Sequence, residues 1–302
     1  MGRPTEIATT VVGTGRLARS LVPLLRPAGH PVVAIVGRRL SAARSVCRHA
    51  RRARATTSLR VGVERGRLIL LAVPDRAIGT AARKLASLDD VDWRRRSVLH
   101  HAGALGCEPL EPLRLAGAGV GVLHPLQSLG VPALAAEILP GSGARIEGDR
   151  RGAAAARRLA RALGLKPLPL RNLSSGDRTA YHAAASLFSN DVLALLAVGV
   201  GLLESIGLDH RRAVDALLPL ARGTLRQVER AGLAGPLTGP APRGDVDTLR
   251  AHLRRLAAGS PEDREIHRLL SIRLARLALE RGEPGARETL SALGGSKRRR
   301  GV

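Results

Sequence analysis

A glycine-rich turn near the amino terminus carries the clearest chemical signal in this chain. Gly13, Gly15 and Ala18 have the spacing G-x-G-x-x-A and follow an apolar run at residues 7–12. The first glycine permits a tight turn, and the second lets the backbone approach a pyrophosphate, which the amides of the next helix then face. This predicts a dinucleotide site, with an ordinary strand-to-helix turn as the alternative. The expected cofactor contacts in the turn are Gly13, Thr14, Gly15, Arg16, Leu17 and Ala18.

The end of the second apolar run indicates which dinucleotide fits. A site for NAD(H) places Asp or Glu there, because a carboxylate accepts hydrogen bonds from the ribose hydroxyls. This chain has Gly37, Arg38 and Arg39 followed by Ser41, so no carboxylate is present. Two guanidiniums can hold a 2′-phosphate, and we therefore predict NADP(H) as the cofactor. Because arginine is frequent throughout the chain, a chance pair is the alternative, and the missing acid is the stronger half of the argument.

Histidines that follow predicted strands are candidates for proton transfer. His100 and His124 end apolar runs, and open α/β sheets bind ligands at the carboxyl ends of their strands. His182 and Asn190 lie eight residues apart, so they can share a helix face. Because a histidine can protonate a carbonyl or imine that accepts hydride, we predict His182, His124 and Asn190 as catalytic residues, with His182 as the proton donor. A structural role for each histidine is the alternative.

Other segments complete the predicted site. The remaining cofactor contacts are expected at Gly37, Val73, Pro74 and His100. Residues 237–245 form a rigid segment rich in Pro and Gly, in which Thr238 and Arg243 are predicted to bind a substrate carboxylate or phosphate. A stiff turn that caps the next helix is the alternative. The histidines have no local ligand spacing, so no metal site is expected.

The elements that must position these residues fall into two classes. The first half alternates apolar runs with helix-like stretches, which is typical of a parallel sheet wound with helices. Strands are expected at residues 7–12, 32–36, 68–73, 97–100 and 120–123, followed by a strand–helix–strand unit over residues 144–170. Residues 177–206 contain no Pro and repeat apolar or small residues in steps of three and four, which predicts one long helix. Shorter helices are expected at residues 211–231, 246–257 and 261–281.

The predicted fold class is therefore α/β plus all-α, a doubly wound Rossmann sheet followed by a helical domain. Residues 1–172 are expected to form the NADP-binding domain. Residues 173–281 are expected to form a helical domain for substrate binding and dimerisation, and residues 282–302 a basic, disordered tail.

Composition narrows the range of partners. A formal net charge of +24 first suggests nucleic acid, but the arginines are scattered through predicted helices and three aromatic residues leave no stacking platform. Cys47 and Cys107 lack a ligand spacing, so we expect two reduced thiols in a cytoplasmic protein. The longest apolar run, residues 192–203, is shorter than the roughly 20 residues that span a membrane. We expect neither a membrane nor a specific nucleic-acid partner.

Together, these segments resemble a family that joins a Rossmann-like domain to a helical domain of unknown function, number 2520. The resemblance extends over residues 7–280 and is most specific at residues 181–190 and 237–245. The build is similar to pyrroline-5-carboxylate reductase, 6-phosphogluconate dehydrogenase and ketopantoate reductase. In those enzymes the cofactor lies on the first domain, the substrate lies in the cleft with the helical domain, and the long helix contributes to a dimer interface. The resemblance implies that His182 and Asn190 line the cleft, with Arg243 nearby.

Two positions depart from the patterns of these enzymes. The β-hydroxyacid dehydrogenases carry a catalytic Lys four residues before the Asn, where this chain has Ser186. A Ser is expected before Gly103, where this chain has Ala102. The chemistry of those dehydrogenases therefore cannot be transferred unchanged.

The resulting hypothesis is an NADP(H)-dependent oxidoreductase that reduces a small carbonyl or imine acid. A ketopantoate-like 2-oxo acid is the preferred substrate, on family analogy, and a homodimer through residues 177–206 is expected. A dinucleotide-binding or sensing protein without turnover is the alternative, which the absent Lys favours. A basic, nucleic-acid-associated protein is the third hypothesis, and strongly salt-dependent DNA binding would distinguish it.

Overall fold

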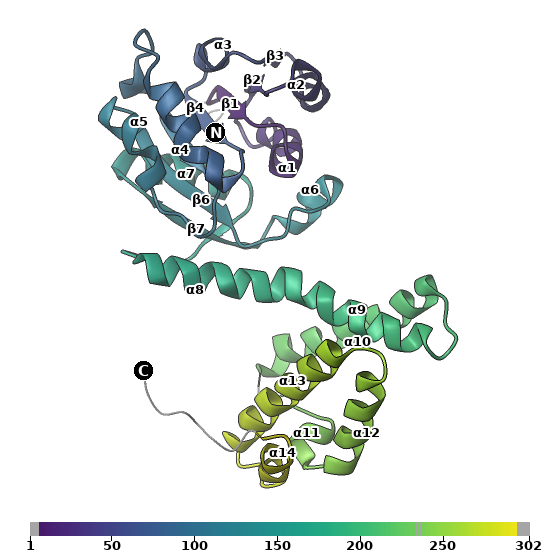
Figure 1. Cartoon of the computed structure of the whole chain (residues 1–302). Helices are drawn as coiled ribbons and strands as arrows, with labels where there is room; N and C mark the ends of the chain where they lie inside the picture. Colours follow the sequence, from purple (N-terminus) through teal and green to yellow (C-terminus); the bar gives the residue numbers. More distant parts are fainter. Residues whose placement is uncertain (1–5, 234, 236, 295–302) are drawn as a thin grey trace. The chain divides into compact units, whose positions relative to one another are not determined.

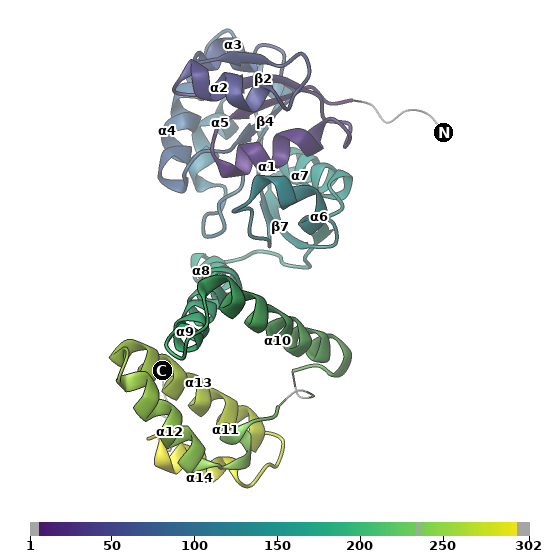
Figure 2. The same cartoon turned by 90° about the vertical axis from the view of Figure 1, so that its right-hand side faces the viewer.

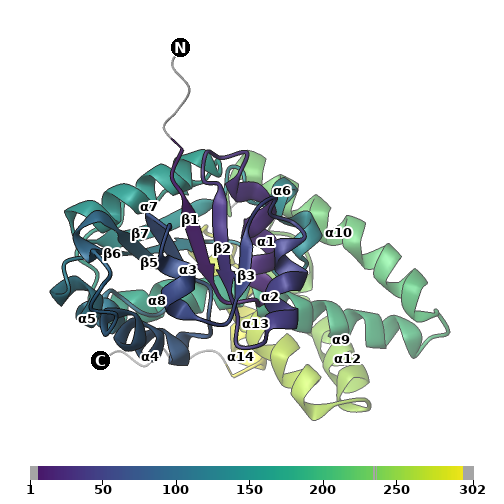
Figure 3. The ribbon, with the colours of Figure 1, turned by 90° about the horizontal axis from the view of Figure 1, so that it is seen from above.

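Eight strands of the first half form one sheet in the order β3-β2-β1-β4-β5-β6-β7-β8. Their bounds are β1 (Thr9–Val12), β2 (Val32–Val36), β3 (Arg54–Thr56), β4 (Leu68–Leu71), β5 (Ser97–His100), β6 (Gly119–Pro125), β7 (Gly143–Gly148) and β8 (Lys166–Pro167). All neighbouring strands pair in parallel except β6 and β7. Figure 3 shows β1, β2 and β3 side by side in this order. The predicted Rossmann sheet is thus confirmed.

The computed structural model describes residues 6–233, 235 and 237–294. The chain divides into two compact units, Met1–Asn190 and Asp191–Val302. The helices of the first unit are α1 (Arg16–Leu25), α2 (Leu40–Cys47), α3 (Leu59–Val63), α4 (Asp75–Ala86), α5 (Glu111–Leu115), α6 (Ala135–Ile138), α7 (Arg150–Ala162) and α8 (Ser175–Ser186). The second unit contains α9 (Val192–Glu204), α10 (His210–Ala231), α11 (Pro240–Arg243), α12 (Val246–Ala257), α13 (Pro261–Leu279) and α14 (Ala286–Ala292).

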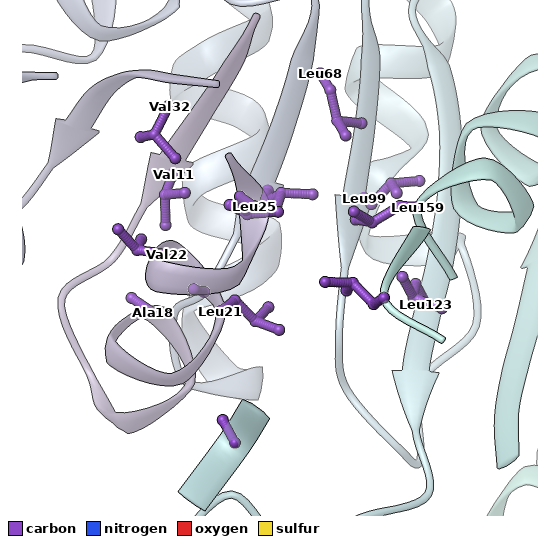
Figure 4. Packing of buried hydrophobic residues seen from close by; sticks show 14 of the residues in the cluster. Val11, Ala18, Leu21, Val22, Leu25, Val32, Leu68, Leu99, Leu123 and Leu159 are labelled. Atoms are coloured by element: carbon purple, nitrogen blue, oxygen red, sulfur yellow. The ribbon is translucent and has the colours of Figure 1, made fainter. Parts of the chain in front are cut away.

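Apolar packing fixes α1 against the sheet beside the glycine-rich turn. Figure 4 shows Val11, Leu21 and Val22 from β1 and α1 packed together with Ala18. Ala18 is fully buried, and its small side chain permits close approach of helix and strand. Strands β1 and β4 are buried along their whole length, as expected for a parallel sheet with both faces covered. The turn after β1 is therefore held by a rigid core.

Three features of the first unit differ from the sequence-based expectation. Strand β3 and helix α3 were not expected, because segments of three and five residues are too short for a period to emerge. The strand expected at residues 166–170 is only two residues long. Strand β7 runs antiparallel to β6, an orientation that apolar periodicity does not encode.

The long helix expected at residues 177–206 forms, with α8 continuing into α9 (Figure 1). A π-helical turn interrupts it. The helix begins at a capping box in which Ser174 and Asp177 bond each other's backbone amides. The π-helical turn covers Leu187–Asp191, between α8 and α9. The helix Ser175–Glu204 contains an 18-residue window with a mean hydropathy of 1.8, so it is long and apolar enough to cross a membrane by length and composition, and 6% of that window is buried.

In the second unit, α11, α12, α13 and α14 share an apolar core (Figure 2). Residues 286–292, expected to be part of a frayed tail, instead form α14. Ala286 and Thr289 are fully buried there, and the Thr289 hydroxyl donates a hydrogen bond to the Ala241 carbonyl at 2.9 Å. The segment is mostly polar, so its sequence did not predict that a small face of the helix would be buried. The basic run at residues 297–300 lies outside the described residues.

Candidate functional site

The glycine-rich turn lies at the switch point of the sheet, where β1 and β4 are neighbours and the chain order reverses. The Gly13 amide donates a hydrogen bond to the Val36 carbonyl at 2.8 Å, and its φ is +125°. A Cβ on Gly13 would collide with the carbonyl of Ala72, which follows β4. Only glycine suits this position, because both the backbone conformation and the space exclude a side chain.

Gly15 presents the opposite situation. Its φ is −75°, and a Cβ built on it would meet no atom within 4 Å. It precedes α1, whose first turn has no side-chain cap and no acidic residue. An uncapped helix N-terminus beside open space is an environment that accepts phosphate. The residues present therefore fit a dinucleotide pyrophosphate. Thr14 precedes Gly15 in the chain, and Arg16 and Leu17 follow it.

Arg38 and Arg39 are exposed at the end of β2, immediately before α2. Neither guanidinium has a hydrogen bond or ion pair within the described part of the chain. Gly37 is buried against Thr14, since a Cβ on Gly37 would lie 2.8 Å from the Thr14 methyl carbon. The two arginines are thus next to the glycine-rich turn and free to bind an anion.

The other predicted cofactor contacts have different environments. Val73 is half-buried and Pro74 exposed at the end of β4, where Pro74 precedes α4. His100 is fully buried, and both ring nitrogens are engaged. Its Nδ1 accepts from the Ala102 amide at 3.1 Å, so its Nε2 donates to the Gly106 carbonyl at 2.7 Å. His100 therefore shapes the loop after β5, and its contact with a cofactor stays a prediction.

His124 and His182 converge on the carboxyl end of β5. Their ring centroids lie 6.1 Å apart at an interplanar angle of 82°. A Cβ on Gly103 would collide with His182 Nδ1 and lie 2.9 Å from His124 Nε2. Gly103 thus leaves the space in which the two rings face each other. The structure brings together two of the three histidines proposed for this end of the sheet.

Tyr181 positions the His124 ring. Its hydroxyl lies 3.0 Å from His124 Nδ1, and the two rings meet edge to face. Burial, reinforced by the Arg145 charge, lowers the pKa of His124 to about 3, so the ring is neutral at pH 7. Burial also raises the pKa of Tyr181 despite the nearby Arg145, so the phenol keeps its proton. This pair consists of two neutral groups that share one hydrogen bond.

A hydrogen-bonded network around the buried Arg145 lies next to the pair of Tyr181 and His124. Arg145 on β7 is fully buried, donates to the carbonyls of Ala102 at 3.0 Å and Leu105 at 2.8 Å, and lies 5.6 Å from the Tyr181 ring centroid. Glu147 accepts from Arg145 and also from Arg178 on α8, at 2.9 Å. These contacts tie the loop after β5, strand β7 and helix α8 together, which explains why α8 belongs to the first unit.

A pocket of about 390 Å³ opens beside this network. It contains all three predicted catalytic residues, His124, His182 and Asn190, together with Tyr181. Ser186, which stands where related dehydrogenases carry Lys, also lines the pocket and accepts a hydrogen bond from Asn190 at 3.3 Å. The π-helical turn brings Asn190 to the wall, in keeping with the frequent use of such turns at functional sites.

Thr238 and Arg243 lie in the second unit, and both are exposed. Arg243 ends α11, directly before Gly244, whose φ of +79° and tight packing against the Gly285 carbonyl exclude a side chain. Asp245 caps α12 by accepting from the Thr248 amide at 3.1 Å. The segment has the stiff, helix-capping geometry named above as the alternative, and substrate binding by Thr238 and Arg243 stays a prediction.

Sequence reasoning did not single out the residues that support the pocket. Tyr181 could have been found, because it is the only tyrosine in the chain and directly precedes His182. Arg145 and Glu147 lie two apart on a strand, a pattern that is usually a solvated edge, and only the fold reveals their burial. Within the described residues, no group of three or more His, Cys, Asp and Glu side chains is arranged to hold a metal ion.

Solved structures with the same fold include three that are informative. A candidate NADP oxidoreductase from Bacteroides fragilis is 24% identical, with a TM-score of 0.72 over 89% of this chain and 98% of its own. A pyrroline-5-carboxylate reductase from Coxiella burnetii is 16% identical, with a TM-score of 0.57 over 97% of this chain and 100% of its own. A reductive aminase from Aspergillus terreus, solved with NADPH and ethyl-5-oxohexanoate, is 15% identical, with a TM-score of 0.60 over 93% and 96%.

Two family models match consecutive parts of the chain. No curated protein matches this sequence closely enough to serve as a relative. A Rossmann-like domain model matches residues 2–125, and the model of a domain of unknown function, DUF2520, matches residues 143–274. The resemblance drawn from the motifs is thereby confirmed, since the chain joins a Rossmann-like domain to a DUF2520 domain.

Proposed function

We propose that this protein is an NADP(H)-dependent oxidoreductase that reduces the C=O or C=N bond of a small acid. The observation that carries the proposal is the open space at Gly15, beside an uncapped helix N-terminus and the unpartnered Arg38 and Arg39. The solved neighbours that are NADP oxidoreductases, or that were solved with NADPH, support the same choice of cofactor.

The cofactor site divides its work between two segments. The amides that open α1 bind the pyrophosphate, and Gly15 lets it come close. Arg38 and Arg39 bind the 2′-phosphate, which a carboxylate at this position would repel. When bound, the nicotinamide supplies the hydride.

The pocket beside α8 supplies the substrate site and the proton. A neutral His124 whose Nδ1 accepts from the Tyr181 hydroxyl carries its proton on Nε2, the nitrogen that faces Gly103 and His182. In this form His124 donates a hydrogen bond to the substrate oxygen or nitrogen without carrying charge. His182 is exposed and acts as the proton donor, while Asn190 orients the substrate.

The substrate class follows from the size and polarity of the pocket. A volume of about 390 Å³ suits a small molecule, and the hydroxyl, amide and imidazole groups of its wall suit a polar one. A ketopantoate-like 2-oxo acid is the preferred substrate. An imine acid is the second choice, since the neighbours include a pyrroline-5-carboxylate reductase and a reductive aminase.

A titration of the purified protein with NADPH and NADH tests this function. We expect NADPH to bind more tightly, and an Arg38→Ala, Arg39→Ala double variant to bind NADPH about as weakly as NADH. An Arg76→Ala, Arg83→Ala variant on α4 loses the same charge and should retain the preference. Equal, negligible binding of both cofactors by the unchanged protein would remove the proposed function.

A dinucleotide sensor without turnover is the second candidate, and Ser186 is the observation that favours it. The pocket lacks the Lys that related dehydrogenases use there. Steady NADPH oxidation with any member of a panel of 2-oxo acids and cyclic imines excludes the sensor. Tight NADPH binding with no turnover across the whole panel supports it.

We also propose that the active form is a homodimer through the long helix. Large apolar side chains are exposed along it at Leu187, Phe188, Val192, Leu193 and Leu195. Exposed apolar surface of this extent requires a cover. Arg178 and Tyr181 bind the start of this helix to the sheet, which opposes insertion into a lipid bilayer and favours a second copy of the chain.

A further inference from the structure

A second hollow, of about 390 Å³, lies at the amino ends of β1, β4 and β5, opposite the carboxyl ends where the proposed cofactor site lies. Its basic lining consists of Arg67, Arg94, Arg95, Arg96, Arg151 and Arg158. Arginine makes up about one residue in seven of the chain but six of the twelve residues that line this hollow. No carboxylate is among the described residues of the lining. The general arginine content therefore does not explain this concentration of charge.

The arginines divide into a structural set and a free set. Arg96 donates to the backbone carbonyls of Glu64 at 3.0 Å and Asp92 at 2.5 Å, and Arg151 donates to those of Arg94 and Gly117. Arg95 has a distant, exposed partner in Asp92 at 3.7 Å.

By contrast, the guanidiniums of Arg67, Arg94 and Arg158 make no hydrogen bond or ion pair with any described residue. They come from three places in the fold, the start of β4, the turn before β5 and helix α7. Three separate segments thus direct unpaired positive charge toward one hollow.

Burial and the neighbouring like charges shift the pKa values of two groups at the hollow. Burial lowers the pKa of Arg96, and the charge of Arg67 lowers it further, while Asp92 partly offsets the effect. Burial also lowers the pKa of His30, which lines the hollow, and the charge of Arg158 adds to the effect. Asp92 offsets the charge of Arg95 and Arg96 only in part, so an external anion would relieve the remaining repulsion.

The rest of the lining is partly apolar. Ile7, Leu68, Ala154 and Ala155 line the hollow together with the arginines. A lining that combines cationic and apolar side chains fits a small organic molecule that carries charge at one end. One phosphate carries about 1.5 to 2 negative charges at pH 7, which is fewer than the three unpaired guanidiniums.

We propose that this hollow is a binding site for the diphosphate group of a small organic molecule. It is separate from the proposed cofactor site, because ligands of that site bind at the carboxyl ends of the strands. Arg67, Arg94 and Arg158 bind the diphosphate oxygens, and the apolar residues of the lining contact the organic part. Arg96 and Arg151 keep the backbone of the rim in place.

The test is calorimetric titration with inorganic pyrophosphate at a constant ionic strength of roughly 0.15 M, which limits screening artefacts. We expect pyrophosphate to bind at least about tenfold more tightly than sulfate or monophosphate. The Nε2 and Nδ1 resonances of His30 should shift during the titration, which locates the site independently of heat.

An Arg67→Ala, Arg158→Ala variant should lose this binding by roughly tenfold or more, because each guanidinium provides charge-assisted hydrogen bonds. Neither guanidinium makes a hydrogen bond or ion pair with a described residue, so Trp93 fluorescence should show an intact first unit. The matched Arg38→Ala, Arg39→Ala variant should retain the His30 shift.

Two outcomes would overturn the proposal. Unchanged His30 resonances with pyrophosphate would remove the site, and so would salt-dependent DNA binding at this face without pyrophosphate binding. NADPH affinity of the Arg67→Ala, Arg158→Ala variant provides the independent check. If NADPH binds normally while pyrophosphate does not bind the unchanged protein, this inference fails and the oxidoreductase proposal stands.

Discussion

Two glycines of the same turn have opposite structural roles. Gly13 is required by the protein itself, because its backbone has a positive φ and the Ala72 carbonyl occupies the side-chain position. Gly15 has an ordinary φ and empty space around it, so nothing in the described protein requires the absence of a side chain. In the proposed function a bound dinucleotide occupies the space at Gly15, so the two roles can be separated by the same substitution.

Gly15→Ala should fold normally and bind NADPH at least about tenfold more weakly, which corresponds to about 1.4 kcal/mol. Gly13→Ala should destabilise the first unit by more than about 2 kcal/mol, because strain and collision act together. Urea unfolding followed by Trp93 fluorescence measures the stability of both variants, and NADPH titration measures their affinity for the cofactor. Unchanged NADPH binding in Gly15→Ala would place the cofactor elsewhere.

The hydrogen bond from Tyr181 should determine the tautomer of His124. In ¹⁵N-histidine NMR spectra of the unchanged protein we expect a neutral ring protonated on Nε2. It should stay neutral from pH 7 to about pH 4, since the folded pKa is about 3. Tyr181→Phe should produce a mixture of tautomers and lower kcat by roughly tenfold with less effect on KM.

The spectra serve as a readout that does not depend on activity. A His124 ring protonated on Nδ1 in the unchanged protein would contradict the assigned role of Tyr181. Tyr181→Phe keeps the ring packed over Arg145, so a loss of folding would itself be unexpected. The Thr179→Val variant, two residues away on an exposed face of α8, is the matched control.

At the scale of elements, buried polar side chains hold the loop after β5. His100 and Arg145 together engage three of its backbone carbonyls, those of Ala102, Leu105 and Gly106. Unpaired buried carbonyls are costly, so these side chains determine the shape of the loop. The π-helical turn acts similarly on α8, because it places Asn190 beside Ser186 at the pocket wall.

Helix α14 should contribute to the stability of the second unit. Thr289→Val removes the hydroxyl that bonds the Ala241 carbonyl and leaves that carbonyl without this partner. We expect a loss of about 1–3 kcal/mol in the free energy of unfolding. Far-UV circular dichroism during urea unfolding checks it, with Thr224→Val on an exposed face of α10 as the control. An effect no larger than that of the control would mean that α14 is only loosely attached.

At the scale of the whole molecule, assembly is the main expectation. Sedimentation should give a particle of about twice the 31.8 kDa chain mass in buffer without detergent. Leu193→Glu, on the exposed apolar part of the long helix, should give monomers. Leu115→Glu on α5 replaces an equally exposed leucine and should leave the dimer intact. A protein that remains in solution only with detergent would instead favour a membrane partner.

Much of the fold could be predicted from the sequence because local rules govern it. The spacing of Gly13, Gly15 and Ala18 encodes a strand, a turn and a helix within a dozen residues. Apolar repeats predicted helix α12 to the residue and most of α10 and α13. The missing acid beside Arg38 predicted the cofactor preference from the chemistry of one position.

Only the tertiary structure decided which polar residues meet. Arg145 and Tyr181 are thirty-six positions apart, and His124 and Tyr181 fifty-seven, so no local period connects them. Their contacts arise because β6, β7 and α8 are brought together by chain reversal and sheet pairing. The same holds for the arginines of the second hollow, which come from three separate segments. Sequence determined the elements and the turn chemistry, because these depend on neighbours along the chain. The fold determined the partners, because burial and charge proximity depend on neighbours in space.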